Sequence, residues 1–207
     1  MTRKFQFILG LFYTSEMVCH NCKIYEVGRN YNLRGVKIMR IELVKATVEM
    51  EPMILDFSSE FKENKEDING CCGLTRFSNY HEWLQYIEKV ENGLIIDRIP
   101  SSTFVAIDNS SKLIVGIIDI RHYLNEEHFY SGHIGYSVRP SVRCRSFGTK
   151  ILKLGLEKAK ELDLEKVLLT CKKSNVASQR VIEKNNGVLE KEIIDDGETY
   201  LVYWILL

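Results

Sequence analysis

The sequence lacks an excess of charge of either sign. Its 28 Lys and Arg residues balance 28 Asp and Glu residues, so composition gives no reason to expect DNA or another polyanion as a general partner. No apolar run approaches the roughly 20 residues that a bilayer-spanning helix needs. Only three prolines occur, and there is no low-complexity tract. We therefore expect 207 residues to form one globular domain, or one domain with an appendage, that binds neither nucleic acid nor membrane.

Cysteines are few, and their spacing does not suggest a secreted disulfide framework. The six cysteines include an adjacent pair, Cys71 and Cys72, and the segment CHNC at 19–22. Reduced thiols and a cytoplasmic location are the better interpretation. CHNC has the spacing of half a zinc site, but a second well-spaced pair is missing. We predict no metal; a zinc-binding interaction protein is an alternative that depends on this segment alone.

The first 38 residues differ in charge from the rest. They hold six basic and two acidic residues, a net charge of +4, which leaves −4 on residues 39–207. The opening MTRKFQFILGLFY has the charged start and short apolar run of a signal peptide but no small-residue cleavage site. Two interpretations stay open: translation begins at Met39, or residues 1–38 are an extension of the domain. We treat 1–38 as an N-terminal extension, either not native or loosely packed, and 39–207 as the functional domain.

Hydrophobic periodicity predicts the order of the elements. Alternating or continuous apolar runs predict strands at 39–47, 102–108, 112–124, 133–138, 166–171, 188–194 and 199–207, and helical spacing predicts helices at 48–66, 80–93, 146–164 and 175–187. Gly93 and Gly187 stand where a left-handed residue often ends a helix. Strands and helices do not alternate as in a doubly wound fold. We predict an α/β (α+β) domain with a mixed, largely antiparallel central sheet and helices on both faces.

The segment RCRSFGT at 143–149 has the parts of an anion-binding turn. The first backbone N–H groups of a helix lack intrahelical partners and carry partial positive charge. Arg143 and Arg145 would add charge, Gly148 would permit close backbone approach, and Thr149 would add a hydroxyl. The alternative is a basic turn whose arginines are solvated or pair with Glu157 and its neighbours.

Two segments resemble the GNAT superfamily of N-acetyltransferases: GYSVRPSVRCRSFGTKIL at 135–152 and NVASQRVIEKNNGV at 175–188. Members have an Arg/Gln-x-x-Gly-x-Gly/Ala turn, which Arg143, Ser146 and Gly148 match at two of three positions. Residues 39–207 as a whole are similar to a bacterial branch of predicted acetyltransferases. The resemblance implies acetyl-CoA as cosubstrate and direct transfer of an acetyl group to an amine of a small molecule or peptide.

The resemblance also implies where the coenzyme binds, namely in a cleft where two adjacent strands separate. The strand ending at Val138 would bond the pantetheine arm, and Asn175 and Ser178 would line the opposite side. The pyrophosphate would be held by the backbone of Cys144, Arg145, Ser146, Phe147, Gly148 and Thr149. Ser146 stands where the family has glycine: with a positive φ its Cβ costs about 1 kcal/mol, and with a negative φ its hydroxyl can donate to phosphate. We expect the turn to bind coenzyme.

Acetyl transfer needs a base for the amine proton and can use an acid for the leaving thiolate. Ile182 occupies the position of the family's usual tyrosine acid. His133 occupies a position that is glutamate in some relatives, and a pKa of about 6.5 suits a base at neutral pH; a packing role is the alternative. Tyr136 and Tyr203 are further candidates for the acid. We name His133 and Tyr136 as catalytic candidates.

Acceptor recognition is predicted at one loop and one strand end. The loop GCCGLTRF at 70–77 often covers the acceptor site in the fold that the resemblance implies, and its Arg76 could meet a carboxylate. Arg121 and His122 end a predicted strand, and Asn125 follows them, so all three are candidate substrate contacts.

Two departures from the family pattern keep an alternative function open. Ser146 in the turn and Ile182 in place of the tyrosine are also what a non-catalytic acyl-CoA-binding sensor or scaffold of the GNAT fold would show. The sequence leaves monomer and homodimer open.

Overall fold

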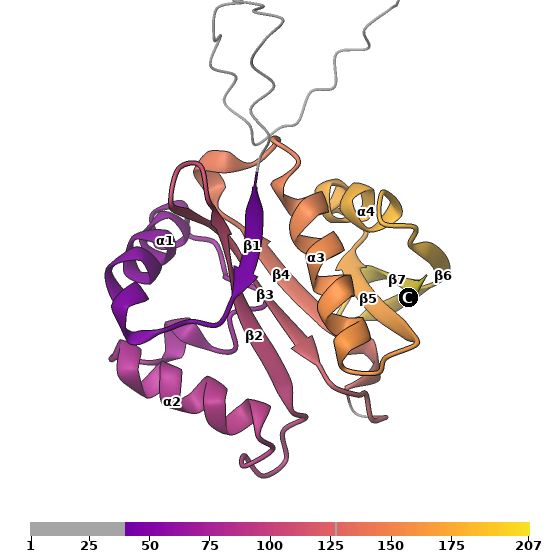
Figure 1. Cartoon of the computed structure of the whole chain (residues 1–207). Helices are drawn as coiled ribbons and strands as arrows, with labels where there is room; N and C mark the ends of the chain where they lie inside the picture. The colour runs from indigo at the N-terminus through magenta and orange to yellow at the C-terminus, as the bar shows by residue number, and fades with distance from the viewer. Residues whose placement is uncertain (1–39, 127) are drawn as a thin grey trace, which may run out of the picture. The chain divides into compact units, whose positions relative to one another are not determined.

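The strands of the domain form two antiparallel sheets. Residues 40–126 and 128–207 are described by a computed structural model (Figure 1). One sheet has the order β1-β2-β3-β4, with β1 at Ile41–Val44, β2 at Ser101–Asp108, β3 at Leu113–Arg121 and β4 at Ile134–Val138. The other has the order β5-β7-β6, with β5 at Lys166–Lys172, β6 at Val188–Asp195 and β7 at Glu198–Leu206. The predictions on residues 1–38, Met39 and the CHNC segment lie outside the described residues.

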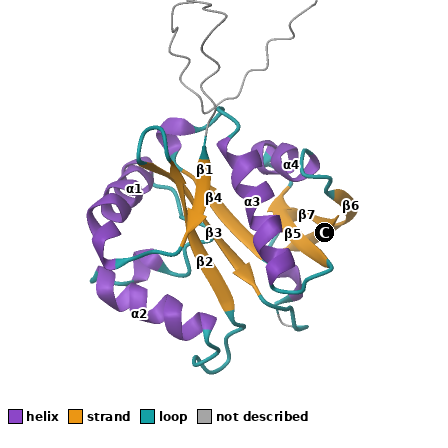
Figure 2. Cartoon of the chain, viewed as in Figure 1, coloured by secondary structure: helices purple, strands orange, loops and turns teal. Residues whose placement is uncertain are grey.

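Helices cover both faces of the first sheet, because alternate side chains of a strand point to opposite faces. The helices are α1 (Glu51–Asn64), α2 (Tyr80–Glu91), α3 (Phe147–Glu161) and α4 (Val176–Glu183). In β3, Ile117 packs in one core with α1 and α2, whereas Ile118 packs in the other with α3. Figure 2 shows α1 and α2 on one side of the strands and α3 on the other. The predicted α+β class with helices on both faces is confirmed.

The two sheets meet at His133 and Leu168 and separate beyond them. The N–H of His133 donates to the carbonyl of Leu168 at 2.7 Å, and the N–H of Leu168 donates to Nδ1 of His133 at 2.9 Å. In the described part of the chain no strand ladder joins β4 to β5. We call the region where β4 and β5 separate the strand divide.

The helix ends follow the sequence with one correction. Gly93 has a φ of 67°, as predicted for the residue after α2, but after α4 the left-handed residue is Asn186, with a φ of 64°, and not Gly187. Gly187 is required for space instead, since a Cβ there would lie 2.3 Å from Cγ2 of Ile182. Within the described ranges, no helix combines the length and the apolar character needed to cross a membrane.

Arg139 fastens α1 to the end of β4. Its side chain is 5% exposed and donates to Asp56 at 2.7 Å and to Glu60 at 2.6 Å. The backbone N–H and the hydroxyl of Ser141 both donate to Glu60 at 3.0 Å. Burial alone would raise the pKa of Glu60, but the hydrogen bonds from Ser141 and Arg139 outweigh it and lower the pKa. A buried guanidinium with both carboxylates in place fixes the segment that leads into α3.

We predict that Gly132→Ala lowers the free energy of unfolding by about 1–3 kcal/mol, measured by urea denaturation. Gly132 has a φ of 71° and a ψ of 172°, a region that is almost restricted to glycine, and a Cβ would lie 2.8 Å from the carbonyl oxygen of Leu168. The matched control is Gly197→Ala, where φ is 75° but no atom lies within 4 Å of the added Cβ. Equal losses in the two variants would show that contact at the sheet junction is unimportant.

Candidate functional site

The turn before α3 takes the left-handed backbone at two positions. Cys144 has a φ of 62° and Ser146 a φ of 63°. Ser146 is the N-cap residue of α3, and its side chain makes no capping hydrogen bond. Of the two conformations considered for Ser146, the structure therefore has the one in which its Cβ is strained.

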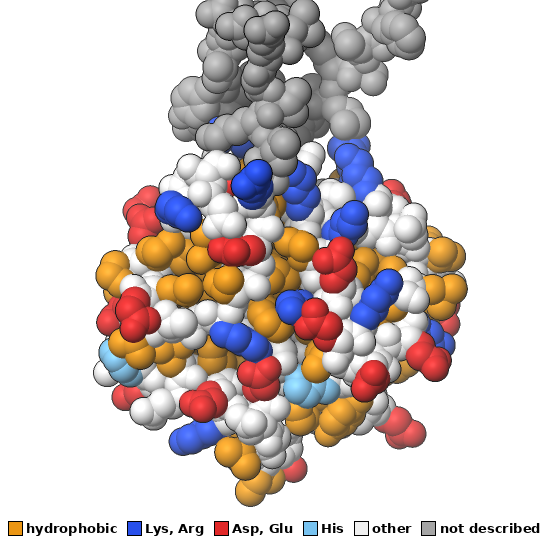
Figure 3. All heavy atoms as spheres, viewed as in Figure 1, with side chains coloured by type: hydrophobic (Ala, Val, Ile, Leu, Met, Phe, Trp, Pro, Cys, Tyr) orange, Lys and Arg blue, Asp and Glu red, His pale blue; other side chains and the backbone are white. Residues whose placement is uncertain are grey.

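The geometry of the turn favours an anion. The backbone N–H groups in the first turn of α3 have no intrahelical acceptors. Lys and Arg side chains gather near this end on the face shown in Figure 3, whereas charges of both signs are interspersed over the rest of that face.

Arg143 is held in place, whereas Arg145 is exposed. Arg143 donates to both carboxylate oxygens of Glu66, at 3.0 and 2.5 Å, and to the carbonyl of Val138 at 3.2 Å. It thus pairs with Glu66 and not with Glu157, the partner considered from the sequence. Among the described residues, Arg145 makes no ion pair. Of the two arginines, Arg145 is the one whose charge is unbalanced.

Four predicted residues line the strand divide from both sides. From β4, the hydroxyl of Tyr136 lies 3.3 Å from that of Ser178 in α4. A Cβ on Gly148 would lie 3.2 Å from Val181 and 3.3 Å from Val138, so glycine brings the start of α3 close to both walls. Asn175 is the N-cap of α4, and its side-chain oxygen accepts from the N–H of Ser178 at 3.0 Å. Burial raises the pKa of Tyr136 to about 12.

The bonding of His133 favours a structural role. Its ring is buried, and Nδ1 accepts the N–H of Leu168. A neutral imidazole has one acceptor nitrogen, so with Nδ1 occupied the proton resides on Nε2 and no lone pair is left for an amine proton. Burial, and secondly the charge of Arg121, lower the pKa of His133 to about 4. Its role as a base stays an untested prediction.

A polar pocket of about 490 Å³ lies between the α1–α2 loop and the first sheet. We call it the loop pocket. It is lined by Asp67, Ile68, Asn69, Gly70, Cys71, Cys72, Gly73, Thr75, Arg76, Arg98, Asp119, Arg121 and Gly135. The loop approaches β4 closely, since a Cβ on Gly70 would lie 2.1 Å from the carbonyl oxygen of Gly135. Arg76 and Arg121, both predicted to bind substrate, come together here.

Three charged residues of the loop pocket were not predicted from the sequence, namely Asp67, Arg98 and Asp119. Asp119 is buried, accepts a hydrogen bond from the hydroxyl of Thr103 at 2.7 Å, and lies opposite Gly135 in the β3–β4 register. Opposite residues of an antiparallel pair point to the same face, and glycine leaves the carboxylate uncovered there. Arg98 donates to the sulfur of Cys72 at 3.1 Å and to the hydroxyl of Tyr86 at 2.8 Å. The single acidic residue within LIVGIIDIR is a signal that would have found Asp119; Arg98 gives none.

The other two substrate candidates lie outside the loop pocket. Nε2 of His122 lies 2.9 Å from the hydroxyl of Ser102, which donates to Glu91 at 2.6 Å. The side-chain oxygen of Asn125 accepts from both the backbone N–H and Nδ1 of His128 at 2.9 Å. The structure therefore does not bring His122 and Asn125 together with Arg76 and Arg121.

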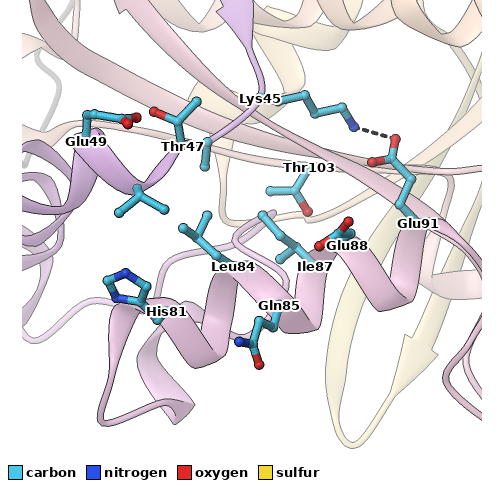
Figure 4. A pocket seen from close by; sticks show the side chains of 12 residues that line it. Lys45, Thr47, Glu49, His81, Leu84, Gln85, Ile87, Glu88, Glu91 and Thr103 are labelled. Atoms are coloured by element: carbon cyan, nitrogen blue, oxygen red, sulfur yellow. Dashed lines mark hydrogen bonds and ion pairs between the residues drawn. The ribbon is translucent and has the colours of Figure 1, made fainter.

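A second pocket, of about 550 Å³, lies between α2 and the segment that joins β1 to α1. Figure 4 shows Leu84 and Ile87 of α2 facing Thr47, with the ion pair of Lys45 and Glu91 at one end. No residue predicted from the sequence to act in catalysis or binding lines it. It touches the loop pocket through Thr103, which lines this pocket and bonds Asp119.

The sequence matches the model of a known protein family. The model of the acetyltransferase (GNAT) domain family matches residues 78–188, more than half of the chain. No curated protein matches the sequence significantly.

Solved structures share the fold at low sequence identity. A ribosomal-protein alanine acetyltransferase from Vibrio fischeri is 14% identical with a TM-score of 0.57, over 80% of this chain and 91% of that one. A GNAT-family acetyltransferase from Bacillus anthracis is 19% identical with a TM-score of 0.54, over 81% and 95%. A protein from Salmonella typhimurium, described as an acetyltransferase and solved with acetyl-CoA, is 11% identical with a TM-score of 0.56, over 80% and 93%.

We predict that Ser146→Gly raises the free energy of unfolding by about 0.5–1 kcal/mol, because it removes the strain of a left-handed Cβ. Ser174→Gly is the matched control, an exposed serine that does not have a positive φ; it should leave stability unchanged or lower it slightly. Urea denaturation measures both. A loss of stability in Ser146→Gly would mean that the serine hydroxyl stabilises the turn.

We predict that stability falls by about 1–2 kcal/mol between pH 7 and pH 5 through His133. Its pKa is about 4 in the folded protein, against the ordinary histidine pKa of 6.5 that the unfolded chain has. Below pH 6.5 the unfolded chain therefore binds a proton that the folded chain does not. Protonation stabilises the unfolded state, and the free energy of unfolding decreases as the pH falls from 6.5 toward 4. Urea denaturation at several pH values tests this, with His133→Asn as comparison because an amide oxygen can still accept from Leu168. An unchanged slope in the variant would contradict the assignment.

Proposed function

Because the chain belongs to the GNAT acetyltransferase family, we propose that it is an acetyl-CoA-dependent N-acetyltransferase that acetylates a small or peptide amine directly. The family makes the protein an acyltransferase. Free thiols at Cys71, Cys72 and Cys171 fit a cytoplasmic location.

The observation that carries this proposal is the alternation along β4. Tyr136 faces α3 and α4 in the strand divide, whereas its neighbour Gly135 faces the loop pocket. A donor in the divide and an acceptor in the pocket would therefore approach each other at adjacent residues of one strand. Holding two reactants close together in this way lowers the entropic part of the barrier to group transfer, which is a large contribution to its catalysis.

The residues of the divide fit acetyl-CoA. Gly148 keeps a Cβ out of the space between Val138 and Val181, and the first N–H groups of α3, with Arg145, suit a pyrophosphate. The N–H of Arg139 donates to the carbonyl of Val115 in β3. Because successive residues of a strand direct their backbone groups to opposite sides, the N–H and C=O of Val138 point away from β3, toward the strand divide. When bound, acetyl-CoA supplies the acetyl thioester.

Within this proposal two residues handle protons. Tyr136 is protonated at neutral pH because its pKa is about 12, so it can donate a proton to a leaving thiolate but cannot accept one. Asp119 lies opposite Gly135 and, among the described residues, accepts one side-chain hydrogen bond, from Thr103, so its carboxylate can take the proton of an amine in the pocket. His133 ties β4 to β5 and thereby sets the position of both groups.

A non-catalytic acyl-CoA sensor or scaffold of the same fold is the alternative. Two observations favour it: Ile182, at the position of the usual tyrosine acid, is 1% exposed, and Ser146 has a strained backbone in the turn. Both functions need the coenzyme, but only the enzyme needs Tyr136 and Asp119.

Calorimetric titration of the full chain with acetyl-CoA tests the shared premise, and we expect one site of micromolar affinity. Release of coenzyme A with a panel of amines then separates the two functions. Binding without transfer to any amine would favour the sensor. No heat and no thermal shift would overturn both.

We predict that Tyr136→Phe and Asp119→Asn each lower kcat by about 10²-fold or more, with acetyl-CoA affinity changed less than threefold. Tyr80→Phe is the matched control, because Tyr80 is a buried tyrosine of α2 whose hydroxyl donates to the carbonyl of Thr47 and has no part in the proposed transfer. Steady-state kinetics and calorimetry provide the readouts. A control loss as large as that of Tyr136→Phe would contradict the role of Tyr136.

A further inference from the structure

The loop pocket contains more positive than negative charge. Its lining includes three arginines, Arg76, Arg98 and Arg121, against two carboxylates, Asp67 and Asp119. Asp67 is exposed, so Asp119 is the buried carboxylate of the lining. A ligand of this pocket therefore meets a surplus of cationic donors.

Two of these arginines, Arg98 and Arg121, donate side-chain hydrogen bonds, and the acceptors are all uncharged groups. Arg121 donates to the carbonyls of Ser131 and Gly132 at 3.3 and 2.6 Å. Arg98 donates to the thiol of Cys72 and the hydroxyl of Tyr86. Among the described residues, no ion pair includes any of the three.

Partly buried guanidinium groups without an anion are unusual, because desolvation of a charge is costly unless an opposite charge compensates it. Arg139, in the same domain, has two carboxylates within 2.7 Å. The pocket arginines form no such ion pair among the described residues. Burial lowers the pKa of Arg121, an effect that the charge of Asp119 opposes and the charge of Arg98 increases, so Arg98 and Arg121 repel each other. An anion placed between them would relieve both effects.

We propose that the acceptor is a small amine that carries a carboxylate, with the carboxylate bound by Arg98 and Arg121 and by Arg76 at the exposed rim. This rests on the proposed function. The amine then lies toward Asp119 and Gly135, where β4 separates the pocket from the strand divide. Guanidinium and carboxylate match in shape as well as charge, since the pair can form two parallel hydrogen bonds. A polyamine meets three like charges and is disfavoured.

The size of the pocket fits a small molecule. A volume of about 490 Å³ is within the range of small-molecule sites. The same chemistry could come from an acidic peptide whose terminal amine enters the pocket, so the test needs an arm for each source.

The experiment measures binding of matched pairs to the full chain by calorimetry, without coenzyme and with coenzyme A. The pairs are glycine and glycinamide, β-alanine and its amide, and 4-aminobutyrate and its amide, which differ in the carboxylate alone. We expect at least one acid to bind at least tenfold more tightly than its amide. Equal affinity in all pairs, or preference for the amides, would overturn the proposal. Tighter binding of glycylglutamate than of any free amino acid would replace the small amine with an acidic peptide.

Variants assign the carboxylate to the arginines. Arg76→Gln, at an exposed position, should reduce the preference for the acid at least threefold, and Arg98→Gln should abolish it. Arg40→Gln, an exposed arginine outside the pocket, is the control and should change nothing. If Arg98→Gln lowers the melting temperature, Arg76→Gln alone decides. An acid preference that survives Arg76→Gln unchanged would contradict the proposed pocket.

The test distinguishes this inference from the proposed function. Transfer of acetyl to the amides but not the acids would leave an N-acetyltransferase with another specificity. Absence of acetyl-CoA binding would remove the proposed function while leaving the calorimetric preference between acids and amides as an independent result.

Discussion

The hydrogen bonds between His133 and Leu168 are the point on which the rest of the site depends. They join the two sheets, and β4 and β5 separate beyond them. A closed sheet would leave no divide for Tyr136 and Ser178 to face. Two unjoined sheets would not hold these groups at a fixed distance. A histidine at this place supplies a side-chain acceptor where a continuing strand would supply a carbonyl, so the ladder ends there without an unpaired N–H.

The charged side chains of this domain differ in whether an opposite charge is paired with them. Arg139 has two carboxylates and a fixed structural task at the end of β4. The arginines of the loop pocket have neutral partners, and Asp119 is held by a hydroxyl. Paired charges stabilise a fold, whereas charges left without counterions are available to a ligand. This difference distinguishes charged residues that stabilise the fold around the site from charged residues that are available to bind a ligand.

Much of the fold could be predicted from the sequence, because apolar periodicity and glycines reflect local geometry. A turn that leads into a helix could be predicted at RCRSFGT for the same reason, whereas its binding of an anion stays a prediction. The loop pocket could be predicted only in part: Arg76 and Arg121 stood out beside a glycine-rich loop and a strand end, but Arg98 meets them through a long-range contact that no local pattern encodes. The structure places His122 and Asn125 outside the loop pocket, beside Ser102 and His128, an arrangement that local spacing does not encode; their contact with substrate stays a prediction. The prediction that Gly187 has a left-handed backbone was wrong. Glycine is needed there because of its contact with Ile182, which forms only when the chain folds back at the end of α4.

The contact between Gly70 and Gly135 limits how this protein can vary. A methyl group on Gly70 would lie 2.1 Å from the carbonyl oxygen of Gly135, and one on Gly135 would lie 3.2 Å from the nitrogen of Gly70. A larger residue at position 70 would require the backbone of β4 at Gly135 to move, and one at position 135 would require the loop backbone at Gly70 to move. In the proposed function, β4 is the strand that separates donor from acceptor. Homologues that change specificity are therefore expected to change residues around this pair and retain both glycines. A library designed to alter the acceptor should keep positions 70 and 135 constant and randomise their neighbours.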